Sequence, residues 1–212
     1  VESTCSIAFA GDSGSGKTSI CTQFVEKKIN YEKLTHPDLQ AFYKIMSFGN
    51  TKIKVQMLDL RGARYEELQK NYLHNVNGCF LVYDISDYNS YKNVTEWYRN
   101  IDDAQKKECF FYLLGNKTDL EMNRQVKAAE AARFAMQNDL GFMEVSAKEG
   151  DNIDEVFRRL VLCFSPKEMR EFRIITKASD QTDGTKIESP EFRVVFQSEN
   201  RENCHCEGCN IF

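Results

Sequence analysis

The chain has 212 residues, of which 42% are hydrophobic and 28% are charged, which excludes a wholly disordered or collagen-like protein. Its length is enough for one domain with an extension. With 28 Lys and Arg against 32 Asp and Glu, the net charge of −4 gives no electrostatic basis for nucleic acid as the main partner. No apolar run reaches the roughly 18–20 residues of a membrane span, and residues 1–7 do not predict a secretory signal.

Strand-like and helix-like patterns alternate along most of the chain. Strands are expected at residues 5–10, 41–48, 51–60, 79–85, 109–115 and 141–145. Gly49-Asn50 separates the second and third strands and is a hairpin signal. Helices are expected at residues 17–25, 91–105, 126–137 and 152–164. This alternation predicts an α/β fold with a six-stranded, mostly parallel, doubly wound sheet, one antiparallel edge strand and helices on both faces.

Two regions differ in composition. Residues 1–164 contain all of the expected elements and are interpreted as one domain, whereas residues 165–212 are polar and charge-mixed and are predicted to be a flexible, largely disordered extension. Five cysteines stand singly among apolar neighbours in the first region, which predicts reduced core thiols of a cytosolic protein: Cys5, Cys21, Cys79, Cys109 and Cys163.

A glycine-rich segment, Gly11-Asp-Ser-Gly-Ser-Gly-Lys-Thr18, follows the first expected strand and fits the pattern G-x-x-x-x-G-K-[ST]. Its glycines let backbone N–H groups surround a phosphate that faces the next helix. Lys17 would reach the β- and γ-phosphates, and the Thr18 hydroxyl would bind Mg²⁺. A chance glycine-rich turn is the alternative, which the strand–loop–helix context disfavours. Nucleotide contacts are expected from Ser13, Gly14, Ser15, Gly16, Lys17, Thr18 and Ser19.

Two further loops follow successive expected strands, at the edge where such sheets bind ligands. The first reads Asn116-Lys117-Thr118-Asp119. A carboxylate there can accept both hydrogens of the guanine N1 and N2 groups, a pairing that adenine cannot offer. The second loop, Ser146-Ala147-Lys148, can add a backbone N–H to the guanine oxygen. Three loops in this order predict a guanine-nucleotide site.

The chain resembles the Rab family of small GTPases, within the Ras superfamily, over about residues 5–164. Besides these loops, Rab-like stretches lie at residues 83–86, 90–97, 114–120, 124–126 and 144–148. The resemblance implies a P-loop small GTPase fold and a monomeric switch: GTP and Mg²⁺ order two switch segments, and hydrolysis releases them. Exchange factors, GTPase-activating proteins and effectors would read those segments during vesicle traffic.

The switch segments depart from the family pattern. The resemblance places Asp59 at the Mg²⁺ site and the Gly62 N–H at the γ-phosphate, but Ala63 replaces the glutamine that orients the attacking water. We therefore expect weakened intrinsic hydrolysis. Arg61 is a candidate for reaching the γ-phosphate within the same chain. Thr35 is the candidate for the second Mg²⁺ hydroxyl, giving Thr18, Thr35 and Asp59 as metal-site residues.

Nearby positions are also unusual. Pro37 follows His36 where the family has Ile-Gly, so His36 is expected to be extended and to face solvent rather than act as a base. The family presents three aromatic residues to effectors; Phe42 and Tyr72 keep two of these places, but Leu58 stands where tryptophan is usual. Either of two residues could cover the guanine face, Ile29 or Tyr31.

The sequence Cys209-Asn-Ile-Phe212 fits C-a-a-X and predicts geranylgeranylation of Cys209, which would attach the protein to the cytosolic face of membranes. One prenyl chain is a marginal anchor. Because residues 165–212 carry 7 Lys and Arg against 9 Asp and Glu, a polybasic patch is excluded as a second signal. Cys204 and Cys206 are candidates for a second lipid; a metal site formed with His205 is the alternative, and its ligand spacing is cramped.

The functional hypothesis is a Rab-like GTPase that binds GTP and GDP with Mg²⁺ and hydrolyses GTP slowly. The first alternative is a binding module that stays GTP-bound or lacks nucleotide and works as a scaffold. The second alternative is a kinase or another ATP-dependent enzyme with the same phosphate loop. The order of the guanine loops disfavours this alternative.

Overall fold

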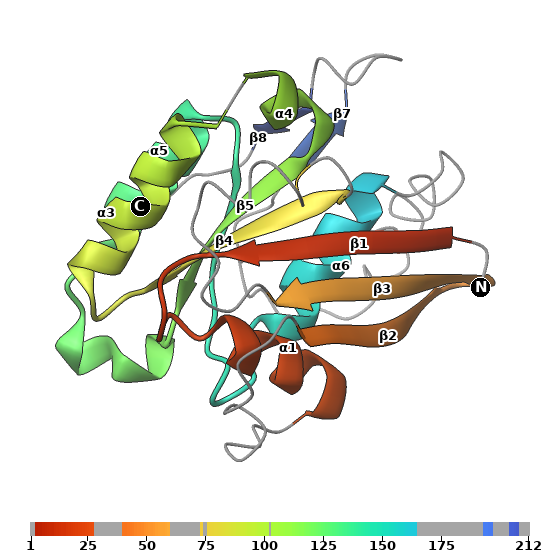
Figure 1. The fold of residues 1–212 in the computed structure, drawn as a ribbon, viewed down its shortest axis with the longest axis horizontal. Coiled ribbons are helices and arrows are strands. Elements are labelled where there is room, and N and C mark those ends of the chain that lie inside the picture. The colour runs from red at the N-terminus through yellow and green to blue at the C-terminus, as the bar shows by residue number, and fades with distance from the viewer. Residues whose placement is uncertain are drawn as a thin grey trace, which may run out of the picture.

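A six-stranded sheet with the order β2-β3-β1-β4-β5-β6 forms the centre of the fold (Figure 1). The computed structural model describes residues 3–27, 40–59, 73, 76–101, 103–164, 193–196 and 204–207. Strands β1, β3, β4, β5 and β6 pair in parallel, and β2 is the antiparallel edge strand. Their bounds are β1 Ser3–Ala10, β2 Gln40–Phe48, β3 Thr51–Asp59, β4 Gly78–Asp84, β5 Phe110–Asn116 and β6 Gly141–Glu144. The predicted sheet is confirmed.

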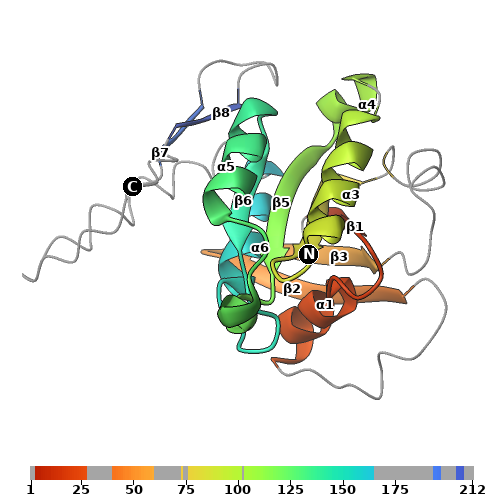
Figure 2. The same ribbon diagram turned by 90° about the vertical axis from the view of Figure 1, so that its left-hand side faces the viewer.

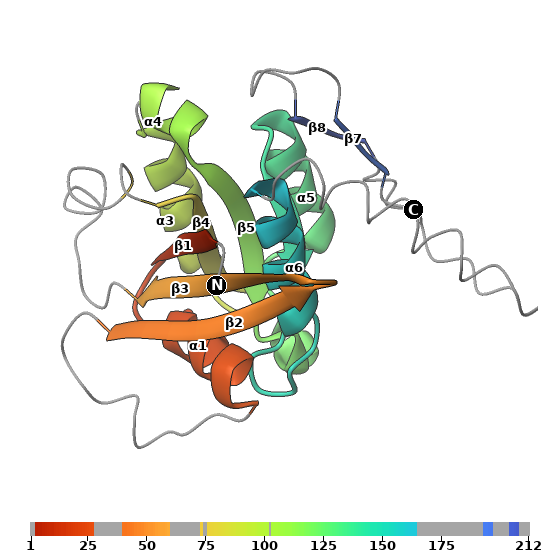
Figure 3. The same ribbon diagram turned by 90° about the vertical axis from the view of Figure 1, so that its right-hand side faces the viewer.

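Helices cover both faces of the sheet, as predicted. Helices α1 (Lys17–Glu26) and α6 (Ile153–Phe164) share one core with the sheet, in which the Phe24 and Phe157 rings stack with centroids 3.7 Å apart. Helices α3 (Tyr88–Arg99) and α5 (Ala128–Gln137) cover the other face. Figure 2 looks onto α3 and α5, and Figure 3 looks from the opposite side, where the edge strand β2 is nearest the viewer.

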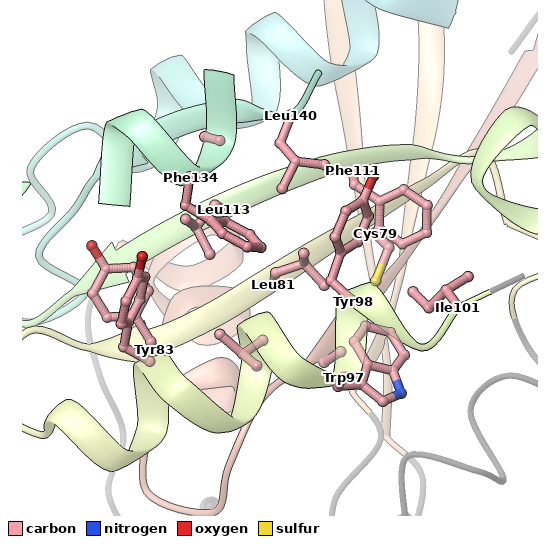
Figure 4. Close-up of a cluster of buried hydrophobic side chains, with 14 of the residues drawn as sticks. Cys79, Leu81, Tyr83, Trp97, Tyr98, Ile101, Phe111, Leu113, Phe134 and Leu140 are labelled. Atoms are coloured by element: carbon pink, nitrogen blue, oxygen red, sulfur yellow. The ribbon is translucent and has the colours of Figure 1, made fainter. Parts of the chain in front are cut away.

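The core under α3 and α5 is rich in aromatic side chains (Figure 4). Trp97 is 4% exposed, so it is a core residue. Tyr98 makes edge contacts with Phe111 of β5 and Phe134 of α5, at centroid distances of 5.2 and 6.2 Å. Leu58, which stands where the family usually has tryptophan, packs against this same cluster. These contacts fix α3 on the sheet, beside the edge that carries the candidate site.

The helix predicted at residues 91–105 is two helices. Helix α3 begins at Tyr88, where the Asp87 carboxylate accepts a hydrogen bond from the Asn89 N–H at 3.0 Å, an N-cap that the prediction missed. It ends before Asn100, and α4 spans Asp103–Glu108. The break lets Ile101, 3% exposed, enter the core. Burial of Ile101 therefore outweighs the helical pattern of residues 91–105, which predicted one continuous helix.

The predicted helix at 126–137 begins later than expected. Val126 is fully buried, and its N–H donates to the Ile85 carbonyl at 3.0 Å, so it belongs to a connection held against the end of β4. The 3₁₀ helix η3, Thr118–Asn123, was not predicted and directly follows β5 and Lys117. This arrangement places a short, kinked element beside the predicted guanine loop.

Four of the five cysteines predicted in the core, Cys5, Cys21, Cys79 and Cys109, are buried thiols, whereas Cys163 is half-buried. Within residues 165–212, which were predicted to be largely disordered, strands β7 (Arg193–Phe196) and β8 (Cys204–Glu207) form a separate antiparallel pair. Among the described residues, no helix combines the length and apolar character needed to cross a membrane.

Candidate functional site

The glycine-rich loop connects β1 to α1 and leaves the first turn of α1 open. Gly16 is the N-cap of α1 in a left-handed conformation (φ 95°), and no side chain caps the helix. A Cβ on Gly16 would lie 2.1 Å from Asn116 Nδ2, and one on Gly11 would lie 2.1 Å from the Val82 carbonyl oxygen. By contrast, a Cβ on Gly14 would meet no atom within 4 Å. The loop therefore packs closely on its inner side, and the N-terminus of α1, which no side chain caps, lies next to it as a place where an anion can bind.

Lys17 spans this loop. Its side chain is largely buried, and Nζ donates to the carbonyls of Gly11 at 2.7 Å and Asp12 at 2.8 Å. Its ammonium is thereby fixed at the mouth of the loop, where it can bind the phosphates that the sequence predicts.

Two oxygen-bearing side chains meet next to the loop. Asp59, the last residue of β3, is fully buried and lies in register with Phe9 of β1. The Thr18 hydroxyl donates a hydrogen bond to Asp59 Oδ2. A hydroxyl and a carboxylate are ligands that suit Mg²⁺, so these residues fit the predicted metal. Thr35, the third predicted metal residue, lies outside the described residues.

Asn116 joins the three predicted loops. It ends β5, is 1% exposed, and donates through Nδ2 to the Ser15 carbonyl of the glycine-rich loop at 2.9 Å. Its Oδ1 accepts from the Ala147 N–H of the third loop at 3.1 Å. One buried amide thus sets the spacing between the phosphate loop and the two loops predicted to hold the base.

Asp119 is held by the third loop. Its Oδ1 accepts a hydrogen bond from the Ser146 hydroxyl at 2.7 Å, and Oδ2 lies 3.7 Å from Lys148 Nζ. The Ser146 hydroxyl in turn accepts from the Glu149 N–H at 3.1 Å. These contacts give the carboxylate a fixed orientation, and its side chain remains 11% exposed.

Comparisons with known proteins agree with this geometry. A profile of the Ras family matches residues 6–164. The Ras-related protein SEC4 of Candida albicans is 30% identical over 166 residues, covering 78% of this chain and 79% of SEC4. Human Ras-related protein Rab-4A is 34% identical over 148 residues (69% and 68% covered), and mouse Rab-15 is 30% identical over 200 residues (92% and 93%). The chain belongs to the Rab family. It is a small GTPase, of the class that serves vesicle transport.

In this Rab-family chain, Lys117 is paired with a residue whose role the sequence analysis did not identify. Lys117 has a left-handed backbone (φ 70°), and its Nζ lies 2.5 Å from Asp84 Oδ2 at the end of β4. The other Asp84 oxygen accepts from the Ser86 N–H and hydroxyl at 2.8 and 2.6 Å. Burial raises the pKa of Asp84, but the hydrogen bonds from Lys117 and Ser86 outweigh it and hold the pKa below its usual value. Asp84 and Lys117 are 33 positions apart, and only the folded sheet, in which Asp84 lies in register with Asn116, brings them together.

A second unpredicted contact joins α3 to the phosphate loop. Asn93 Nδ2 donates to Asp12 Oδ2 at 2.7 Å. Asn93 lies in a Rab-like stretch and Asp12 in the glycine-rich loop, but their pairing spans 81 positions and only the fold shows it. Helix α3 therefore contacts the loop directly, in addition to packing on the sheet.

The structure brings all the predicted phosphate-loop and base-loop residues to one edge of the sheet. Ser13 and Gly14 are exposed on the loop, and Ser19 is half-buried in α1. The predicted switch residues Arg61, Gly62 and Ala63 lie outside the described residues. So do Ile29, Tyr31, His36, Pro37, Tyr72 and Cys209.

Proposed function

We propose that this protein is a guanine-nucleotide switch that binds GDP and GTP with Mg²⁺ and regulates vesicle-mediated membrane traffic. The observation that carries the proposal is the Asp119 carboxylate, held by Ser146 and Lys148 at the same sheet edge as the phosphate loop. In this place, it can accept the N1 and N2 hydrogens of guanine, which adenine cannot supply.

The phosphate site supports the proposal. The open first turn of α1 and the Lys17 ammonium favour an anion, and Thr18 with Asp59 would hold Mg²⁺. A bound Mg²⁺ would supply positive charge that neutralises the phosphates. The protein's part is to position the phosphates through the loop N–H groups and Lys17.

Intrinsic GTP hydrolysis should be slow, because Ala63 has no group that can orient water. Single-turnover hydrolysis by the Ala63→Gln variant should be at least about tenfold faster, the effect of one positioning contact of about 1.4 kcal/mol. Equal rates for the two proteins would refute this explanation. An Arg61→Ala variant tests the second possibility: a slower rate would mean that this arginine assists the reaction.

The presence of alanine at position 63, where the family has glutamine, favours one alternative function, a persistently GTP-bound scaffold. Chromatography of the nucleotide released from the purified protein separates the two functions. We expect GDP, which indicates turnover. GTP would support the alternative, and no nucleotide in a folded protein would indicate a pseudo-GTPase. We infer that exchange factors, activating proteins and effectors bind the switch segments in the way the family implies.

We further propose that prenylation of Cys209 attaches the protein to membranes from the cytosolic side, because the last four residues fit C-a-a-X. Intact-mass analysis after expression with the prenylation machinery should show one geranylgeranyl group. That group should be missing in a Cys209→Ser variant, and membrane sedimentation should fall with it. An unmodified Cys209 in the parent protein would contradict the proposal.

A further inference from the structure

Arg124 uses its whole guanidinium group to join two elements behind the base-binding loops. Nη1 and Nη2 donate to the two Glu144 oxygens at 2.7 and 2.9 Å, a bidentate pair. Nε and Nη2 bind Glu121 at 2.9 and 2.7 Å, and Nη1 also donates to the Val126 carbonyl at 3.0 Å. An arginine side chain has five N–H donors on three nitrogen atoms, and all three nitrogens of Arg124 donate hydrogen bonds here.

The partners of Arg124 belong to opposite sides of the site. Glu121 lies in η3, directly after the loop that ends in Asp119, and Glu144 is the last residue of β6, just before Ser146. The Arg124 N–H also donates to the Glu121 carbonyl at 3.1 Å and closes η3. On the other side, the Glu144 carbonyl accepts from Asn152 Nδ2 at 2.9 Å, which closes the third loop upon itself.

Of the two ion pairs of Arg124, the one with Glu144 is the one that can fix the spacing of the two loops. Arg124 and Glu144 side chains are 18% and 19% exposed, whereas Glu121 is 64% exposed, and exposed ion pairs hold geometry weakly. The connection is needed because η3 is short and its backbone leaves helical geometry at Leu120 (φ −96°, ψ 32°). Closer to the base, Asp119 is held by the Ser146 hydroxyl and by Lys148, which is itself 61% exposed.

We propose that Arg124 is a positioning residue: by clamping Glu144, it sets the distance between Asp119 and the Ser146 loop and so determines how strictly the site selects guanine. This inference rests on the proposed guanine-nucleotide function. A misplaced Asp119 carboxylate would weaken the hydrogen bonds from both N1 and N2 of guanine, whereas IDP has only the N1 hydrogen bond to lose. GDP affinity should therefore fall more than IDP affinity, while the phosphate contacts remain.

The test compares the affinities of GDP and IDP, whose base lacks the N2 amine, by equilibrium titration in Mg²⁺. In Arg124→Ala and in Glu144→Gln, GDP affinity should fall at least about tenfold, or about 1.4 kcal/mol, and IDP affinity much less, so the GDP/IDP ratio narrows. Arg124→Lys should be intermediate, because lysine cannot make the bidentate pair. The double variant should lose no more than either single variant.

Arg159→Ala is the matched control, since it removes an arginine–glutamate pair of similar exposure within α6 (Nε to Glu155 Oε1, 2.6 Å) and should leave the ratio unchanged. Circular dichroism of each variant establishes that it is folded; if Arg124→Ala is not, Arg124→Lys and Glu144→Gln carry the test. An unchanged ratio in folded variants would overturn the proposal. Absence of GDP binding by the parent protein would instead refute the proposed function.

Discussion

Replacing Asn116 by alanine should destabilise the protein strongly even when no nucleotide is bound. The side chain is 1% exposed and makes two buried hydrogen bonds, to the Ser15 carbonyl at 2.9 Å and from the Ala147 N–H at 3.1 Å. Alanine keeps the backbone but leaves both partners unsatisfied. At about 1–3 kcal/mol for each orphaned group, the free energy of unfolding should fall by about 2–6 kcal/mol. The melting temperature should then fall by at least about 4 °C.

The assay is urea unfolding of nucleotide-stripped protein, which removes any contribution of ligand binding to stability. Asn138→Ala is the matched control: its Nδ2 donates one hydrogen bond to the Phe134 carbonyl at 2.8 Å, and the residue is half-buried at the end of α5. That variant should lose about 1 kcal/mol. If Asn116→Ala costs no more than Asn138→Ala, the bridging role assigned to Asn116 is wrong.

Three further predictions follow from other contacts of the site and the core. Asp84→Asn removes the 2.5 Å ion pair with Lys117 and should accelerate release of fluorescent GDP about tenfold or more; an unchanged rate would show that the pair is dispensable. Ser15→Ala should raise the free energy of unfolding by about 1 kcal/mol, because the buried Ser15 hydroxyl has no hydrogen-bond partner in the described part of the chain; a loss of stability would contradict this. Burial raises the pKa of Cys5 from 9.0 to about 12, so the unfolded thiol ionises first and stability should fall above pH 9, by up to about 1.4 kcal/mol per pH unit for this group. Urea unfolding between pH 8 and 10 measures that slope, which Cys5→Ala should reduce.

The sheet and the loops at its edge could be predicted because their signals are local. Each predicted loop follows an apolar strand, and parallel strands bring their carboxyl ends together, so Lys17, Asn116 and Ser146 could be assigned to one edge from the sequence alone. The break between α3 and α4 could not be predicted, since it depends on burial of Ile101 against residues from other elements.

The supporting contacts of the site were missed for a similar reason. Asp84 pairs with Lys117 across 33 positions, Asn93 with Asp12 across 81, and Arg124 with Glu144 across 20. A charged or amide side chain on an exposed-looking stretch gives no sign of its partner until the chain is folded. Sequence reasoning therefore predicted the loops that meet at the sheet edge and missed the contacts that hold these loops in position.

The central claim is that this sheet edge binds a guanine nucleotide with magnesium. Isothermal titration of nucleotide-stripped, folded protein in Mg²⁺ buffer tests it most directly, with GDP, GTP, ADP and ATP as titrants. We predict saturable heat with GDP and GTP and none with ADP or ATP, because Asp119 pairs with groups that adenine lacks. No heat with either guanine nucleotide, or equal affinity for the adenine nucleotides, would contradict the account.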